Sequence, residues 1–328
     1  MDRKEVIIRL PRILVTYGFR NLTLLLAVSI LTFVLVMASP VDPVGQYILG
    51  LGTAVSPEQR MEIEEYWGVN EPPVERYIHW MTELSRGNLG ESVLYRRPVA
   101  AIIRERFFNS LALMICAWIL SGGAGFFFGC IMGMYREQLP DRFLKKLCYL
   151  LSSVPTFWLG LVFLLVFSVW LKWFPVGFSS PIGVLKENVT IWERLHHLVL
   201  PAFTLSFMSF ANIALHTRQK LVDVLNSDYV LFARARGEGK WTILWRHGLR
   251  NILFPALTLQ FSSFAELFGG SVMAENVFSY PGLGSAAAAA GLNSDVPLLL
   301  GVTLFSALFV AVGNMLANLL YGIVDPQI

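Results

Sequence analysis

The stretch Gly237-Glu238-Gly239-Lys240 has the residue types of a loop that binds phosphate through backbone N–H groups. That motif, G-x-x-x-x-G-K-[ST], requires a glycine five residues before the second glycine and a serine or threonine after the lysine. Arg234 and Trp241 occupy those two positions. A strand should also come before the loop, but the surrounding spacing is helical. We therefore expect that the chain does not bind ATP through this stretch.

Other residue types that could do chemistry also lack the partners they need. The pair His196-His197 has no third ligand nearby, and the three cysteines have neither metal-ligand spacing nor an evident disulfide pairing. Ser262 and Ser263 have no histidine or lysine close in sequence that could act as a base. The sequence predicts no catalytic residue, no metal site, no cofactor held by this chain, and buried free thiols at Cys116, Cys130 and Cys148.

Glu266 lies within a long apolar run, where an ionisable side chain costs free energy and often serves transport. We favour a position lining a pathway, together with Gln260. The alternative is a structural carboxyl that is protonated or hydrogen-bonded by Ser262, Ser263 or Gln260.

The composition is that of a membrane protein. The 328 residues are 55% hydrophobic and 15% charged, with a mean hydropathy of +0.57 and a net charge of +3. A soluble chain has about a quarter charged residues, and the modest net charge does not indicate nucleic-acid binding. Long uncharged runs predict an all-α fold with six transmembrane helices. These are 22–38, 107–134, 147–171, 198–215, 252–273 and 298–324.

The segments between these runs complete the predicted organisation. Residues 1–38 form the N-terminus and first helix, 39–107 a small helical extracytoplasmic insertion, and 108–328 a core with a basic loop at 216–250. In the insertion, Ser56-Pro57-Glu58-Gln59 predicts a helix start, Gly68 its end, and Gly87 the end of a second helix. The apolar face of that second helix is predicted to consist of Val74, Tyr77, Ile78 and Met81. A glycine- and alanine-rich loop is expected at 274–297.

Small residues recur every four positions in the second predicted span, at Gly125, Gly129 and Gly133. This spacing lets another helix approach closely. We favour helix packing over a hinge at these positions.

Charge asymmetry predicts the orientation. The loops on the side of both termini hold 16 Lys or Arg and 8 Asp or Glu, against 10 and 14 on the other side. By the positive-inside rule the termini and the basic loop are cytoplasmic.

The stretch from Asp228 to Thr258 mixes arginines with large apolar residues at helical spacing, and a break is expected at Gly237 and Gly239. Trp241, Leu244 and Trp245 indicate either anchoring in the membrane interface or docking in a protein groove. Glu238 is expected on the exposed face.

This stretch resembles the cytoplasmic coupling loop of binding-protein-dependent ABC importer permeases, in the dipeptide, oligopeptide and nickel branch. Similar residues stand along nearly the whole chain. Glu238-Gly239 departs from the commoner residues after the glycine, and proline arrives only at Pro255. The residues that carry the resemblance are Arg12, Asp42-Pro43, Ser56 to Gln59, Gly87 to Gly90, Arg97 to Val99, Pro155 to Trp158, Leu200 to Ala202, Asp228-Tyr229, Ala233 to Gly237, Arg246-His247, Leu249 to Asn251, Glu275 to Gly284 and Asp325-Pro326.

The resemblance implies a type I-like permease in a prokaryotic inner membrane. It implies four kinds of partner: a second similar permease, two ATPases that bind ATP and Mg, an extracytoplasmic solute-binding protein and the bilayer. The substrate class remains open among peptides, nickel, metal-chelator complexes and some sugars. An ion-coupled secondary transporter and an intramembrane hydrolase are the alternatives. The residues implied to contact an ATPase are Tyr229, Ala233, Arg234, Ala235, Arg236, Gly237, Trp241, Leu244 and Trp245.

Overall fold

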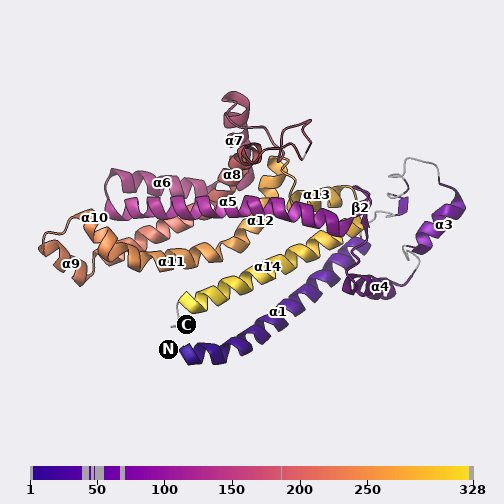
Figure 1. Cartoon of the computed structure of the whole chain (residues 1–328), viewed down its shortest axis with the longest axis horizontal. Helices are drawn as coiled ribbons and strands as arrows, with labels where there is room; N and C mark the ends of the chain where they lie inside the picture. Colours follow the sequence, from indigo (N-terminus) through magenta and orange to yellow (C-terminus); the bar gives the residue numbers. More distant parts are fainter. Residues whose placement is uncertain are drawn as a thin grey trace. The chain divides into compact units, whose positions relative to one another are not determined.

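The computed structural model describes residues 3–38, 44–45, 48, 55–66, 71–185 and 187–324 (Figure 1). This part of the chain is helical apart from a short antiparallel pair, β1 (Glu91–Ser92) and β2 (Arg97–Pro98). The predicted all-α fold class is confirmed. The chain divides into two compact units, Met1–Asn109 with Pro281–Val312, and Ser110–Tyr280 with Gly313–Ile328.

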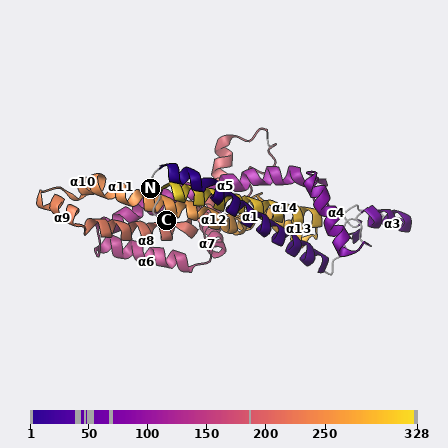
Figure 2. The same ribbon diagram turned by 90° about the horizontal axis from the view of Figure 1, so that it is seen from below.

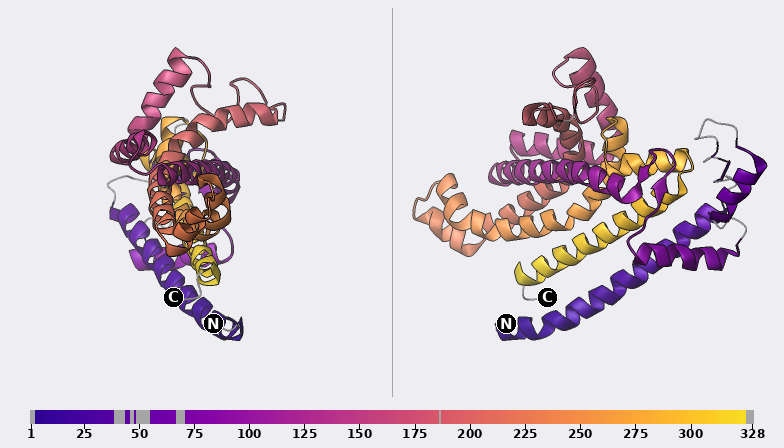
Figure 3. Two further views of the ribbon diagram at one scale, coloured as in Figure 1. Left: turned by 90° about the vertical axis from the view of Figure 1, so that its left-hand side faces the viewer. Right: turned by 45° about the vertical axis from the view of Figure 1, so that its right-hand side comes forward.

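In the first unit, α4 (Pro73–Ser85) packs against α1 (Arg3–Ala38), as Figure 3 shows. The ring centroids of Tyr77 and Trp80 lie 5.3 and 6.2 Å from the ring centroid of Phe33. Val74 and Ile78 stay exposed, so the predicted apolar face contacts α1 only in part.

The predicted helix starts and stops in this unit follow local chemistry. α3 (Pro57–Tyr66) begins with reciprocal hydrogen bonds: Ser56 N donates to Gln59 Oε1 and Gln59 N to Ser56 Oγ. Gly87 follows α4 with φ +82°, as expected for a helix end. Hydrogen bonds from Asn88 and Arg86 hold the pKa of Glu83 below its ordinary value. The predicted end at Gly68 lies outside the described residues.

The predicted loop at 274–297 is wrong, because helices occupy much of it. α12 (Phe264–Val277) extends into it, and α13 (Leu283–Leu292) contains the alanine run, alanine being the strongest helix former. Asp295 then caps α14 (Val296–Val324), because its Oδ1 accepts a hydrogen bond from Leu298 N at 3.2 Å. The same buried carboxylate accepts hydrogen bonds from Leu94 N and Ser92 Oγ.

The second unit is a helical bundle whose axis is α8, with α6, α7, α11 and α12 packed on it. Figure 2 shows α6 beside α8. Its elements are the C-terminal part of α5 (Val99–Met134), α6 (Leu139–Ser153), α7 (Thr156–Phe163), the π-helical η1 (Leu164–Trp170), α8 (Ile191–Leu225), α9 (Asp228–Ala235), α10 (Lys240–Ile243), the π-helical η2 (Leu244–Gly248), α11 (Leu249–Ser262), α12 and the C-terminal part of α14.

The glycines of α5 face α8, which confirms the packing interpretation. A Cβ added at Gly129 would lie 2.6 Å from Thr217 Cβ and 2.7 Å from the carbonyl oxygen of Ala214. At Gly133 it would lie 2.8 Å from a methyl of Leu221. The absence of side chains here lets the two helices approach closely.

Four described helical stretches are long and apolar enough to cross a membrane, and two bent pairs bring the total to six if each pair is one span. The four are Gly18–Ala38, Val99–Met134, Ile191–Leu225 and Val296–Met315. α5 and α8 are therefore longer than predicted, because helices continue past their apolar parts.

The predicted spans 147–171 and 252–273 each fall on a bent pair of helices, and the sequence analysis did not predict the bends. Leu139–Ser153 and Thr156–Trp170 meet at 107°, and Figure 1 shows α7 turning away from α6. Val154, with ψ 130°, is extended because Pro155 disfavours helical backbone in the residue before it. The other pair, Lys240–Ser262 and Glu266–Val277, is bent by 57°.

Candidate functional site

A tight turn joins α9 to α10, and we call Asp228–Gly248 the α9–α10 segment. Gly237 N donates to Arg234 O and Glu238 N to Ala233 O, the pair of bonds that closes a helix with a left-handed residue. Gly237 is that residue, with φ +83°. The break predicted at Gly237 is present.

The helix that follows this break is long. Lys240 to Ser262 is helical without interruption, through α10, η2 and α11. Residues 216–225 belong to α8, and Asn226 and Ser227 separate α8 from α9. The predicted basic loop 216–250 is therefore mostly helical, and its polar residues lie on helices that extend beyond the apolar spans.

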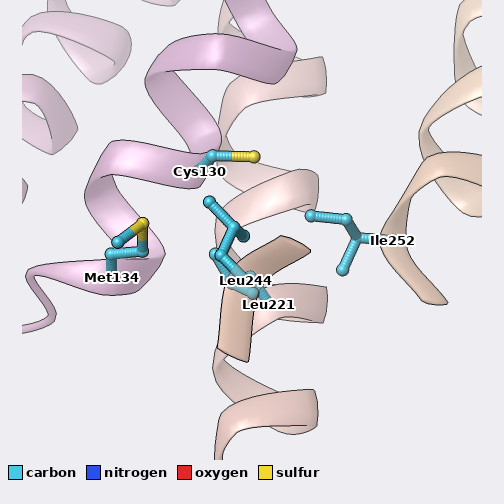
Figure 4. Packing of buried hydrophobic residues seen from close by; sticks show 5 residues of the cluster. All are labelled: Cys130, Met134, Leu221, Leu244 and Ile252. Carbon is cyan, nitrogen blue, oxygen red and sulfur yellow. The ribbon is translucent and has the colours of Figure 1, made fainter. Parts of the chain in front are cut away.

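Some residues of the segment are used for packing inside the chain. Leu244, 4% exposed, joins Cys130 and Met134 of α5, Leu221 of α8 and Ile252 of α11 in one apolar cluster (Figure 4). A second cluster contains Val230, Ala233 and Ile243. The prediction that Leu244 and Ala233 contact a partner is corrected, because their side chains are buried in this chain.

Four large rings of the segment remain uncovered by this chain. Trp245 is 70% and Phe232 67% exposed, Trp241 56% and Tyr229 47%. We call these four residues the exposed aromatic face. Arg234, Ala235, Arg236 and Gly237 are also exposed, so the structure brings all the remaining predicted contact residues to the surface of one segment.

One hydrogen bond joins the segment to α11, and charged groups contact one another within the segment. Asn251 Nδ2 donates to Tyr229 Oη at 3.1 Å. Glu238, expected to be exposed, has a side chain only 13% exposed and lies 3.4 Å from His247 Nε2. Arg236 Nη2 and Arg246 Nη1 lie 3.8 and 3.9 Å from Glu238 Oε1. The expectation for Glu238 is wrong because the turn directs its carboxylate toward η2.

A buried ion pair that the sequence analysis missed ties α6 to α8. Arg218 Nε and Nη2 donate to the two carboxylate oxygens of Asp141 at 2.6 and 2.7 Å. The Asp141 side chain has no exposed surface and that of Arg218 is 11% exposed. Asp141 stands in the first turn of a helix that begins at Leu139-Pro140, but nothing in the sequence pairs it with a residue 77 positions away.

The two candidate pathway residues differ in environment. Gln260 is buried, and its Nε2 donates to Trp118 O while Trp118 Nε1 donates to Gln260 O at 2.8 Å. Glu266 is exposed on α12. Gln260 thus links α5 to α11, and a pathway role for either residue stays a prediction.

Glu275 is a buried acid that the sequence analysis missed because it placed this residue in a loop. It lies in α12 and accepts a hydrogen bond from Ser110 Oγ at 2.6 Å.

The histidines and cysteines have structural surroundings. His196 Nε2 and His197 Nδ1 each lie 2.8 Å from a backbone carbonyl oxygen, of Trp173 and Gly177. Among the described residues, no three His, Cys, Asp or Glu side chains gather as metal ligands would. The three cysteines are free thiols; Cys130 and Cys148 are buried, and Cys116 is half-buried.

Known proteins resemble this chain along nearly its whole length. Residues 125–328 match the family described as binding-protein-dependent transport system inner membrane component, and residues 10–114 match the N-terminal region of such membrane components. The chain belongs to this family. It is therefore a multi-pass inner-membrane permease component of a binding-protein-dependent ABC transport system.

Individual relatives agree with the family. An oligopeptide transport system permease protein of Bacillus subtilis is 35% identical over 309 residues, covering 94% of this chain and 96% of the relative. A putative peptide transport system permease protein of Brucella abortus is 35% identical, covering 93% of this chain and 94% of the relative. A probable peptide ABC transporter permease protein of Sinorhizobium fredii is 34% identical, covering 92% of this chain and 94% of the relative.

Proposed function

We propose that this chain is the permease subunit of an ATP-driven peptide importer, and that the α9–α10 segment is its docking element for an ATPase subunit. Peptide as the substrate class is supported by the relatives, whose names specify peptide or oligopeptide. In this proposal a second similar permease completes the pathway, a solute-binding protein delivers peptide, and two ATPases bind ATP and Mg in the cytoplasm.

The observation that carries the docking proposal is the exposed aromatic face at the end of a buried scaffold. Aromatic side chains that fill a partner's groove supply much of the free energy of an interface. Tyr229, Phe232, Trp241 and Trp245 are uncovered, while Leu244 and Ile243 of the same segment are 4% and 1% exposed. The segment thus has some apolar side chains packed on its own chain and others available to a partner.

The scaffold also provides a route by which movement reaches the membrane spans. α8 reaches α9 after two residues, and α10 continues into α11 without a break. Because the apolar cluster around Leu244 joins α5, α8 and α11, a displacement of the segment moves three spans together. Closure of an ATPase dimer on the segment would therefore rock the bundle between inward- and outward-facing states.

The test is the affinity of the ATPase subunit for the complex carrying Trp241→Ala and Trp245→Ala. Truncation of such anchors costs on the order of 2 kcal/mol or more, so we expect at least about 30-fold weaker binding. Trp192→Ala is the matched control, because Trp192 is 80% exposed at the opposite end of α8. Retention of native ATPase affinity by the double variant would refute the docking proposal.

A further inference from the structure

The exposed side of the chain from the end of α11 through α12 is polar, although it belongs to a candidate span. The opposite side of α12 is buried where this helix packs on α7 and α8, with Leu267 and Ala274 at 0% and 1% exposure. The exposed residues recur every three or four positions, as one side of a helix does. We call them the polar stripe: Ser262, Glu266, Gly269, Met273 and Asn276.

The exposed residues of α5 have a different composition. None of those between Ser110 and Met134 is polar, as expected for a surface that faces acyl chains. They are Ala112, Ile115, Ile119, Leu120, Gly123 and Phe127. The polar stripe instead carries a hydroxyl, a carboxylate and an amide, which indicates contact with water rather than with lipid.

Glu266 is the polar group of the stripe that this chain leaves unpaired. Ser262 Oγ donates to Thr258 O at 3.1 Å and Asn276 Nδ2 to Val272 O at 2.7 Å, so both bond to their own helix. The Glu266 carboxylate has neither a hydrogen bond nor an ion pair among the described residues. Residues 252–265 and 267–274 contain no other ionisable side chain. A carboxylate in an apolar span costs free energy unless water or a cation reaches it, so the stripe suits a water-filled pathway that carries a cation.

We propose that the polar stripe lines the solute pathway and that the Glu266 carboxylate binds the N-terminal ammonium group of a peptide in transit. Peptide as the solute rests on the proposed function. Peptides differ in their side chains, but every unmodified peptide has an α-amino group, whose pKa of about 8 keeps it mostly protonated at neutral pH. A carboxylate and an ammonium group form a charge-assisted hydrogen bond. Because Ser262 Oγ gives its proton to Thr258 O, its oxygen offers a second acceptor one turn away.

The test is equilibrium dialysis of radiolabelled tri-alanine against the detergent-purified complex of permease and ATPase subunits, without the solute-binding protein. N-acetyl-tri-alanine is the matched ligand, because acetylation removes the positive charge and keeps the rest of the peptide. A hydrogen bond to a charged group changes affinity at least about tenfold. We therefore expect Glu266→Gln to weaken tri-alanine binding by that factor and to leave binding of the acetylated peptide unchanged.

Two variants serve as controls. Glu266→Asp keeps a carboxylate and should bind tri-alanine more tightly than Glu266→Gln does. Glu187→Gln removes an exposed carboxylate before α8 and should keep the native affinities. Equal affinity of the native complex for both peptides, or no measurable binding of tri-alanine, would overturn the proposal. Equal losses for both peptides in Glu266→Gln would also overturn it, because they would show a structural role rather than contact with the ammonium group.

Thiol labelling tests the hydration of the stripe separately. The thiolate is the reactive form of cysteine, and a thiol ionises far more readily in water than in lipid. Ser262→Cys should therefore react with a small water-soluble thiol reagent in membranes that contain the complex. Ile119→Cys is the control, since Ile119 is 59% exposed among the apolar residues of α5, and it should react much more slowly. Both changes are made with Cys116→Ser, because Cys116 is half-buried. Similar rates at the two positions would overturn the pathway position of the stripe.

This site can fail while the proposed function stands. Uptake of tri-alanine by the complete native system, with its solute-binding protein, tests the peptide assignment without changing Glu266. Uptake combined with equal affinity for the two peptides would overturn the Glu266 site and leave the peptide importer intact. Absence of uptake would overturn the peptide assignment itself.

Discussion

Gly237 determines the geometry of the α9–α10 turn through its backbone alone. Its φ of +83° lies in the left-handed region, and a Cβ there would meet nothing within 4 Å. A β-branched residue at this position is strained by backbone sterics rather than by a clash, at a cost of about 1–2 kcal/mol. The turn that orients the exposed aromatic face therefore depends on glycine.

Gly237→Val should uncouple peptide transport from ATP hydrolysis while the spans still insert. The measurement is peptide uptake per ATP hydrolysed in vesicles that contain the whole complex. Gly239→Val is the control, since Gly239 has φ −72° and equally open space. If both variants transport with native stoichiometry, the turn does not set coupling.

The sequence predicted individual residues better than their partners. The break at Gly237 could be predicted because glycine allows a left-handed turn, and Trp241 and Trp245 were singled out because they stand among arginines. Their contact with an ATPase stays a prediction. The burial of Leu244 and of Glu238 could not, because an apolar or charged residue in a short helix has no fixed face until that helix is packed. Asp141 and Arg218 meet only because α6 folds back on α8.

At the scale of elements, close packing of α5 on α8 holds the scaffold of the docking segment. Gly129→Ala would place its Cβ 2.6 Å from Thr217 Cβ and 2.7 Å from a backbone oxygen. Overpacking of this kind costs about 1–3 kcal/mol. We expect the variant to have a lower thermal unfolding midpoint in detergent.

Gly123→Ala is the matched control, because Gly123 is on the same helix with nothing within 4 Å of an added Cβ. Alanine is a better helix former than glycine by about 1 kcal/mol, so its midpoint should stay level or rise. A Gly129→Ala chain as stable as the Gly123→Ala chain would show that the α5–α8 contact is loose.

Helices could be predicted where one local property of the sequence, such as an apolar run or a capping pattern, determines them. Apolar runs gave the spans, and the Ser56 capping pattern and Gly87 gave helix ends. The bend at Pro155 was missed because proline can also kink a helix without breaking it. α13 was missed because its alanines and glycines predict a helix only once a cap and packing are in place.

At the scale of the whole molecule, orientation in the membrane is the prediction on which docking depends. Charge asymmetry predicts that Gly239 faces the cytoplasm and Asn188 the outside. Both residues are exposed, and the native Cys130 and Cys148 are buried. Asn188→Cys should react with an impermeant thiol reagent in sealed cells, and Gly239→Cys only after lysis. Labelling of Gly239→Cys in sealed cells would reverse the topology.

The central claim is that the α9–α10 segment contacts an ATPase, and site-specific photo-crosslinking in the assembled complex tests it most directly. A photoreactive amino acid replaces Phe232, 67% exposed, or in a control Leu185, 72% exposed in the loop before α8. The account predicts a covalent product between this chain and an ATPase subunit from position 232 and none from position 185. No ATPase product from position 232, with or without ATP, would contradict it.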